Sequence, residues 1–277
     1  MKNVKNEPGR TYQKFGKYYD ILYDPFIDYN SDCDFIEKIL SSFNTPPLQL
    51  ENRGRYWLLD AGCGTGNHAL ELARRGFNIV GFDLSRQSLI SANEKCSIDP
   101  VISSRVHLFQ QNISELSLKS KFDAVMALFG VLSYISREQS LEAVLANLRA
   151  HLEPGRLLIG EIWQQSGVLP EFNDKSIGKD QDNNLELERR TESRTAVGSS
   201  ITEVKMDFTL KDLQSGNVID TFAEIHYLRS YDLFDFTESL GRSGFKLIRF
   251  SDADIKIKEF KHINPKTLRT FFVARAV

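Results

Sequence analysis

The glycine-dense stretch from residue 57 to residue 76, WLLDAGCGTGNHALELARRG, constrains the fold of this chain most. It begins with an apolar run suited to a buried parallel strand and ends with apolar residues at helical spacing. The glycines at 62, 64 and 66 adopt positive φ readily and leave space for a ligand against the backbone. A helix that starts after such a turn offers free N–H donors. The stretch therefore predicts a strand, a tight turn and a helix that bind a nucleotide-like cofactor.

Two acidic residues narrow the kind of cofactor. Asp60 stands two positions before the first glycine, and Asp83 follows the next apolar run, Ile79 to Phe82. The glycines read G-x-G-x-G, whereas the dinucleotide-binding turn of an NAD-dependent oxidoreductase reads G-x-G-x-x-G. The two segments, LLDAGCGTG and VGFDLS, resemble the first two motifs of class I S-adenosylmethionine (SAM) dependent methyltransferases. The spacing disfavours the oxidoreductase.

This resemblance implies a set of contacts with SAM. In that family the glycine turn lies against the methionine part of SAM, and the acid after the second strand binds the ribose hydroxyls. Asn112 stands where the family usually has an aspartate, and its amide oxygen can accept from the adenine amino group. An aromatic face lined by Tyr19, Tyr23 and Phe129 would stabilise the cationic sulfur. The expected cofactor-binding residues are Tyr19, Asp60, Ala61, Gly62, Gly64, Gly66, Asp83, Leu84, Asn112, Ile113, Ala127 and Phe129.

Composition excludes several classes of partner. The 277 residues include 35 basic and 37 acidic side chains, so no strong field exists for nucleic acid or an anionic membrane. We expect a small-molecule substrate, no nucleic acid and no membrane. Cys33, Cys63 and Cys96 lack the spacing of a disulfide framework or a metal site, so we expect reduced thiols and no metal. The N-terminus has no apolar signal core, and a cytoplasmic location is expected.

Alternating strand and helix patterns predict a doubly wound α/β fold with a mainly parallel, seven-stranded sheet. We assign residues 51–172 and 231–277 to this SAM-binding core and residues 1–50 to an N-terminal helical cover. The cover contains a tyrosine-rich segment, Tyr12 to Tyr29, with one aromatic helical face. Residues 173–230 form an insertion that we expect to cover the substrate site. We predict a mobile loop over 173–184 and then three antiparallel strands, over 185–197, 201–210 and 218–230.

Further segments narrow the family. FGKYYDILYD, FDAVMALFGVLSYI, EIW and HYLRSYDLFDFTESLGRSGF resemble the small-molecule N-methyltransferases that dimethylate the amino group of nucleotide-linked deoxyamino sugars. The similarity runs over nearly the whole chain. Glycine and other small-amine methyltransferases share the aromatic N-terminal helix and the β cover.

The resemblance also implies two catalytic positions. The active-site tyrosine of the family falls on Tyr23, and a histidine of the family falls on Tyr134. A tyrosine with an ordinary pKa of about 10 is a poor base, so we interpret Tyr134 as a positioning group. Glu161 and His226 are further candidates, each with a purely structural alternative. Basic residues of the insertion either bind acceptor phosphates or are simply solvated; they are Arg189, Arg190, Arg194 and Lys205.

The predicted reaction is in-line displacement at the SAM sulfonium by a small-molecule acceptor, with nitrogen favoured over oxygen. It depends on proximity and orientation, and it requires the amine to arrive neutral. The alternatives are an O-methyltransferase of a small molecule and a SAM-binding protein without activity. A homodimer through the β insertion is a further hypothesis.

Overall fold

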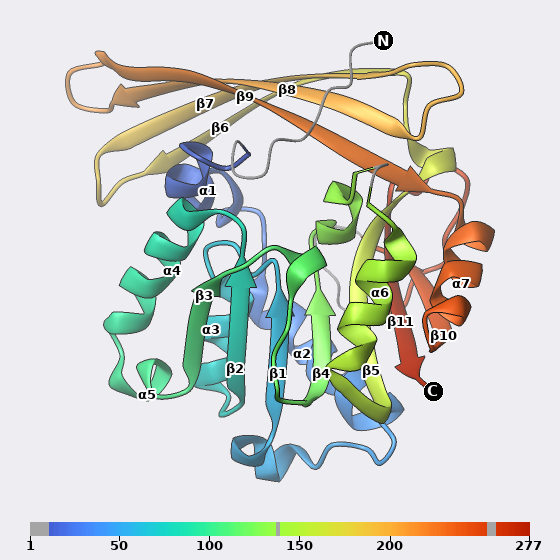
Figure 1. Ribbon diagram of the computed structural model, residues 1–277. Coiled ribbons are helices and arrows are strands. Elements are labelled where there is room, and N and C mark those ends of the chain that lie inside the picture. The colour runs from blue at the N-terminus through green and yellow to red at the C-terminus, as the bar shows by residue number, and fades with distance from the viewer. Residues whose placement is uncertain (1–10, 137–138, 254–258) are drawn as a thin grey trace.

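The computed structural model describes residues 11–136, 139–253 and 259–277. A central sheet with helices on both faces forms the body of the molecule. A second, antiparallel sheet lies across the ends to which the parallel strands point, and helix α1 (Phe15–Tyr23) lies between the two (Figure 1).

The central sheet has the strand order β3-β2-β1-β4-β5-β11-β10. The first five of these strands are parallel, β11 runs antiparallel to β5, and β10 runs antiparallel to β11. The predicted seven-stranded, mainly parallel sheet is therefore confirmed. Its strands are β1 (Trp57–Ala61), β2 (Asn78–Asp83), β3 (Val106–Gln110), β4 (Phe122–Ala127), β5 (Leu152–Gln164), β10 (Phe245–Asp252) and β11 (Arg269–Ala276).

Helices bury both faces of this sheet, which explains why its central strands are almost continuously apolar. One core cluster lies under α2, α3 and α5, and the other lies under α6 and α7. The helices are α2 (Tyr29–Phe43), α3 (Asn67–Arg74), α4 (Arg86–Ser97), α5 (Pro100–Ser103), α6 (Leu141–Ala150) and α7 (Leu233–Arg242). Short 3₁₀ turns lie in the connections between helices and strands: η1 (Leu50–Arg55), η2 (Ile113–Glu115), η3 (Val131–Tyr134) and η4 (Gln165–Gly167).

The antiparallel sheet contains one more strand than expected. Its strands are β6 (Glu171–Asp180), β7 (Leu185–Thr195), β8 (Ile201–Asp212) and β9 (Val218–Tyr231). The predicted mobile loop over 173–184 was wrong, because most of it is the edge strand β6. Edge strands are often charged, and this one pairs Lys175 and Lys179 with glutamates of β7 instead of alternating apolar residues.

Helix α1 is wedged tightly between the cover sheet and the body. A Cβ at Gly178 of β6 would lie 2.0 Å from the carbonyl oxygen of Ile21, and one at Gly16 would lie 2.5 Å from Ser88 Oγ. The helix begins later than its aromatic pattern suggested. Tyr12 has φ 59° and lies in the turn before the helix, where its N–H donates to Glu224 of β9.

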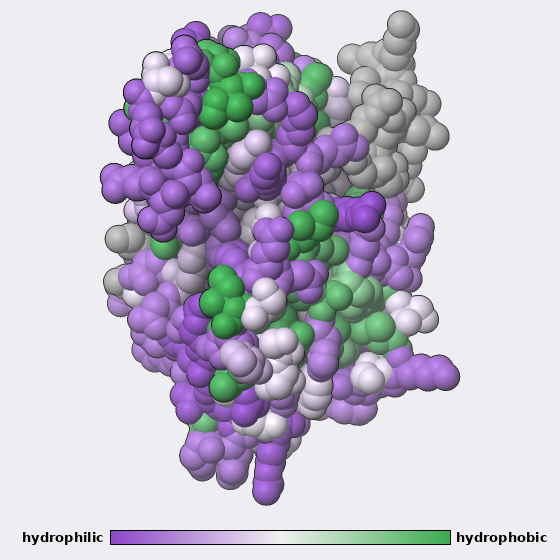
Figure 2. Space-filling view, turned by 90° about the vertical axis from the view of Figure 1, so that its left-hand side faces the viewer, coloured by the Kyte–Doolittle hydropathy of each residue, from purple (hydrophilic) through white to green (hydrophobic). Residues whose placement is uncertain are grey.

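The molecular face that carries α4 and α5 is largely hydrophilic, with hydrophobic side chains in small separate patches (Figure 2). Ile98 and Val101 are the large apolar residues most exposed near α4 and α5, at 82% and 59%. Within residues 11–136, 139–253 and 259–277, no helix is long and apolar enough to cross a membrane.

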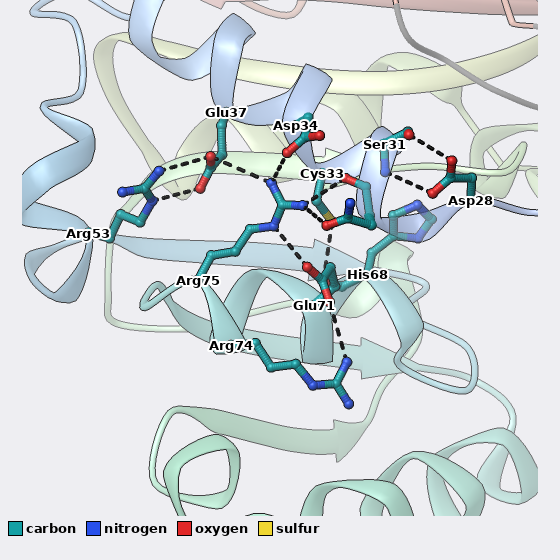
Figure 3. Close-up of polar contacts among 11 residues, drawn as sticks. Asp28, Ser31, Cys33, Asp34, Glu37, Arg53, His68, Glu71, Arg74 and Arg75 are labelled. Atoms are coloured by element: carbon teal, nitrogen blue, oxygen red, sulfur yellow. Dashed lines mark hydrogen bonds and ion pairs between the residues drawn. The ribbon is translucent and has the colours of Figure 1, made fainter.

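An arginine at the end of α3 ties this helix to α2 (Figure 3). The Arg75 guanidinium donates to Asp34 at 2.6 Å, to Glu71 at 3.0 Å and to the carbonyl oxygen of Asn30 at 2.8 Å. Its side chain is only 14% exposed. The neighbouring Arg74 is 56% exposed and makes a single longer contact of 3.4 Å with Glu71. These two arginines therefore differ both in burial and in the number of groups to which they donate.

Arg75→Ala should lower the free energy of unfolding by about 2 kcal/mol, because it leaves the largely buried carboxylates of Glu71 and Glu37 without their charged neighbour. Arg74→Ala should change it by less than about 0.5 kcal/mol, as an exposed ion pair does. Urea unfolding followed by circular dichroism measures both values. Equal effects of the two substitutions would contradict the assignment of Arg75 as the link between α2 and α3.

Candidate functional site

The glycine turn after β1 leaves an open space at its centre. Gly62, Gly64 and Gly66 all have positive φ, at 72°, 54° and 80°. A Cβ at Gly62 would lie 2.4 Å from Val131, and one at Gly66 would lie 3.1 Å from Ala92, whereas one at Gly64 would meet no atom within 4 Å. The outer two glycines therefore permit close packing. The central one borders a space that a ligand can fill.

The two predicted acids lie beside this space. Asp83 accepts from the N–H of Gly64 at 2.9 Å and from that of Ser85 at 2.7 Å, so it closes the turn and starts α4. Asp60 is only 4% exposed, and among the described residues its carboxylate has no hydrogen-bond partner. Burial raises the pKa of Asp60 to about 6, although the His68 ring opposes this rise. A buried carboxylate without a partner fits a ligand that brings N–H donors or a positive charge.

Other predicted cofactor residues differ in what they can offer. The side chains of Ala61 and Ala127 are fully buried in the core, so only their backbone is available to a ligand. Leu84 and Ile113 are half-buried. The amide oxygen of Asn112 accepts from the N–H of Ser114 at 3.0 Å, which leaves it one further lone pair. Whether these residues contact SAM stays a prediction.

Asp20 of α1 connects the tyrosine-rich helix to the glycine turn. Its carboxylate accepts from Thr65 Oγ1 at 2.7 Å, from Asn67 Nδ2 at 3.0 Å and from Lys95 Nζ at 2.7 Å. These donors come from the turn, α3 and α4. Sequence reasoning missed this role, since the only signal is an acid directly after the tyrosine pair of α1.

The predicted aromatic residues of α1 lie together. The rings of Tyr19 and Tyr23 are tilted by 33° with their centroids 4.4 Å apart, and Phe15 lies against both. Burial raises the pKa of Tyr19 well above its ordinary value, so this hydroxyl stays neutral. The oxygen of Tyr23 accepts from Arg189 Nη1 at 2.7 Å, and this guanidinium also lies 5.5 Å from the Tyr23 ring centre.

Arg189 differs from the other basic residues of the insertion. Arg190, Arg194 and Lys205 are exposed, as expected for a solvated strand face. The Arg189 side chain is 13% exposed, and its buried Nε has no hydrogen-bond partner. Its nearest carboxylate, Asp174, lies 3.9 Å away. Of these four basic residues, Arg189 is the one that donates to the predicted catalytic tyrosine.

A buried ion pair lies at the end of β5. Glu161 is 1% exposed, and its Oε2 accepts from Arg269 Nη2 at 2.6 Å and Nε at 3.1 Å. The other carboxylate oxygen of Glu161 has no partner. The Arg269 guanidinium lies 4.8 Å from the ring centre of Phe129, whose φ of 53° is unusual for a non-glycine residue. The sequence drew attention to Glu161 and Phe129, but nothing in it marked Arg269.

Tyr134 joins a buried chain of hydrogen bonds. Its hydroxyl lies 2.9 Å from that of Tyr12 and 2.7 Å from Nδ1 of His226. Nε2 of His226 lies 3.1 Å from Glu224 Oε2. Burial raises the pKa of Tyr134, which agrees with its interpretation as a neutral positioning group. Sequence reasoning missed Tyr12 and Glu224. The signal for Glu224 was its place two residues before His226, on the same face of a strand.

Comparison with known proteins decides the family. Residues 58–155 match the family model described as "Methyltransferase domain". A protein of Geobacillus sp. (strain WCH70) that is named as a methyltransferase is 31% identical over 55% of this chain and 57% of its own length. The dTDP-3-amino-3,4,6-trideoxy-alpha-D-glucopyranose N,N-dimethyltransferase of Streptomyces venezuelae is 25% identical over 69% of this chain and 75% of its own.

A solved structure extends the likeness to the whole fold. The S-adenosylmethionine-dependent methyltransferase of Clostridium acetobutylicum ATCC 824 superposes with a TM-score of 0.73 at 25% identity, over 96% of this chain and 98% of its own. This chain is a SAM-dependent methyltransferase. The resemblance predicted from its sequence motifs is thereby confirmed, and the doubly wound fold is that of class I methyltransferases.

The residues of this methyltransferase fit SAM on structural grounds. The open space at Gly64 admits a ligand against the backbone, and Asp60 offers an unpartnered carboxylate to a cationic amino group. Asp83 keeps lone pairs for ligand hydroxyls after accepting two N–H groups. In the described part of the chain, no group of three or more His, Cys, Asp or Glu residues could hold a metal ion.

Gly64→Ala should weaken SAM binding by about tenfold or more while leaving the methyltransferase folded, because the new methyl group enters the open space at the turn. Gly198→Ala is the matched control. Gly198 lies in the β7–β8 turn with φ 74°, and a Cβ there also meets no atom within 4 Å. Both variants carry similar backbone strain, so calorimetry with SAM should separate them. Equal affinities for the two variants would contradict a ligand space at Gly64.

Asp60→Asn should change how stability depends on pH. Because folding raises this pKa from 3.8 to about 6, the group contributes stability below about pH 4 that is lost as the pH rises through about 6. Asparagine does not titrate, so the variant does not lose this stability as the pH rises. The free energy of unfolding of the variant minus that of the parent chain should therefore increase by about 2 kcal/mol between about pH 4 and about pH 8. Urea unfolding at both pH values measures it, with the exposed Asp182→Asn as control, and a parallel shift in both variants would refute the assignment.

Proposed function

We propose that this methyltransferase transfers the methyl group of SAM to the amino nitrogen of a small molecule of the amino-sugar kind. The unpartnered Oε1 of Glu161 is the observation that best supports an amine. A buried carboxylate oxygen accepts hydrogen bonds and favours a positive charge, and a protonated amine supplies both. The Streptomyces venezuelae relative is named for the dimethylation of such an amino sugar.

We propose that SAM is held at the glycine turn. Asp60 would receive its amino group, Asp83 its ribose hydroxyls, and the backbone at Gly62 and Gly64 its methionine part. When bound, SAM supplies a methyl group on a positively charged sulfur. The rings of Tyr19 and Phe129 are electron-rich faces suited to that charge.

Tyr23 is proposed to orient the acceptor. Its oxygen already accepts from Arg189, so its own proton is free to point elsewhere in the site. The same arginine contact keeps the phenol ring in one position, against Tyr19. Holding an acceptor in line with the methyl group converts a bimolecular step into an effectively unimolecular one, and this supplies a large part of the rate acceleration.

We assign residues 1–50 and 173–230 to two covers over a core of residues 51–172 and 231–277. Support comes from α1 and the β6–β9 sheet, whose inward residues surround Tyr23 and Tyr134. Such covers exclude water from the acceptor. A homodimer through the insertion stays a prediction, which light scattering checks. Ile219 and Ile225 on the outer face of β9 are 55% and 47% exposed.

Tyr23→Phe should lower turnover of the acceptor by about tenfold to a hundredfold, because the amine loses one orienting contact. The assay uses SAM with a panel of nucleotide-linked amino sugars, glycine, sarcosine and sugar hydroxyl compounds, and mass spectrometry locates the new methyl group. Tyr18→Phe is the matched control, since Tyr18 lies on the same helix against Phe222. Unchanged turnover in Tyr23→Phe would refute the role of Tyr23.

The same panel tests the proposed reaction itself. Methylation on oxygen alone would make the chain an O-methyltransferase. Tight SAM binding without transfer to any compound would indicate a SAM-binding protein.

A further inference from the structure

We propose that His226 takes up the proton of the acceptor's ammonium group through the hydroxyl of Tyr134. His226 is then a positioning residue that acts through Tyr134, and Glu224 and Tyr12 hold this relay in place. The inference rests on the proposed transfer to nitrogen. It explains how a site with tyrosine at the position of the family's histidine can still prepare a neutral amine.

The relay is continuous and buried. Tyr134 from η3 and His226 from β9 are 92 residues apart in the sequence, yet Tyr134 Oη and His226 Nδ1 lie 2.7 Å apart. His226 is 1% exposed and Glu224 is 7% exposed. The Tyr12 ring meets the His226 ring edge-on, with centroids 4.9 Å apart. A proton that reaches His226 is therefore shielded from bulk water.

Glu224 determines where the protons of this chain lie. Burial alone would raise its pKa, but hydrogen bonds from His226 and from the N–H groups of Phe15 and Tyr12 hold the pKa of Glu224 below its ordinary value. An ionised carboxylate only accepts, so Nε2 of His226 must carry a proton. In the neutral ring Nδ1 then accepts, and Tyr134 donates to it. The hydroxyl of Tyr12 in turn donates to the oxygen of Tyr134.

Tyr134 is left with one lone pair for an incoming donor. An N–H of the acceptor's ammonium group can fill it, because Tyr134 packs against the same hydrophobic cluster as Tyr19 and Tyr23. Transfer then proceeds in two linked steps. The acceptor N–H bond breaks as a new O–H bond forms at Tyr134, while the original Tyr134 O–H bond breaks as an N–H bond forms at Nδ1 of His226.

The products of this transfer are a neutral amine with a free lone pair and an imidazolium beside Glu224. Tyr134 remains a neutral phenol before and after, which suits its burial. Among the residues that the structure describes, the titratable groups that face His226 are Glu224 on its own strand, Tyr134 of η3 and Tyr12 before α1. The residue opposite on β8 is Val204, which does not titrate. The carboxylate is therefore the charged partner of the new imidazolium.

The test is the pH dependence of kcat/KM for His226→Asn, with the amine of the panel that is methylated best. Asparagine can still accept from Tyr134 but cannot hold a proton. Below the acceptor's own pKa, the variant must use only the neutral fraction of the amine. Its kcat/KM should fall by about tenfold per pH unit toward acid, more steeply than the parent's. Above the acceptor's pKa the two should agree within about twofold.

His107→Asn is the control, because His107 is an exposed histidine of β3 that stacks on Trp57. It should follow the parent at every pH. A loss in His226→Asn that is equal at all pH values would show a structural role and overturn the relay. Methylation of no amine in the panel would instead overturn the proposed function, so the two failures are distinguishable.

A second measurement uses the parent protein alone and needs neither an acceptor nor a substituted variant. Nitrogen-15 NMR of histidine-labelled parent protein reports which ring nitrogen of His226 carries the proton. We expect Nε2 protonated and Nδ1 bare at neutral pH. A proton on Nδ1 with Nε2 bare would overturn the relay, since Nδ1 could not then receive the acceptor's proton.

Discussion

The carboxylate of Asp20 is the contact on which the geometry of this methyltransferase depends. It accepts from Thr65 in the glycine turn, Asn67 in α3 and Lys95 in α4, and so fixes the tyrosine-rich helix against the turn. Charge-assisted hydrogen bonds of this kind are shorter and stronger than neutral ones. Tyr19 and Tyr23 lie in the same helix as Asp20. On the side of the glycine turn, this one acidic side chain therefore holds both tyrosines beside the proposed SAM site.

Much of the fold could be predicted from local patterns. The strand, glycine turn and helix around Gly62 to Gly66 depend on residues that are neighbours in sequence, and glycine's backbone freedom is visible there. The apolar strands of the central sheet are equally visible, since both faces are buried. The β6 strand could not be recognised, because its lysines pair with glutamates of β7 and leave no apolar alternation. An edge strand is defined by its neighbour more than by its own side chains.

The residues of the candidate site also divide into those that a local motif marks and those that depend on distant partners. Asp60, Asp83 and Tyr23 could be proposed from the sequence because they stand at fixed distances from a recognisable motif. Arg269 and Glu224 were missed because their partners, Glu161 and the start of α1, are 108 and about 210 residues away. Arg189 was seen only as one of four basic residues, since which face of β7 points inward depends on register. Pairings between distant segments carry no signal in the residues of either segment alone.

The contacts of α1 with the cover sheet have a consequence for the modularity of this enzyme. Gly178 touches the backbone at Ile21, Arg189 holds Tyr23, and Glu224 caps the start of the helix. The first helix and the late insertion therefore form one interlocking unit, although more than 140 residues separate them. A chimera that borrows the β6–β9 sheet of a relative must borrow that relative's first helix as well. Exchanging the insertion alone would bring together a helix and a sheet whose contacting residues do not match.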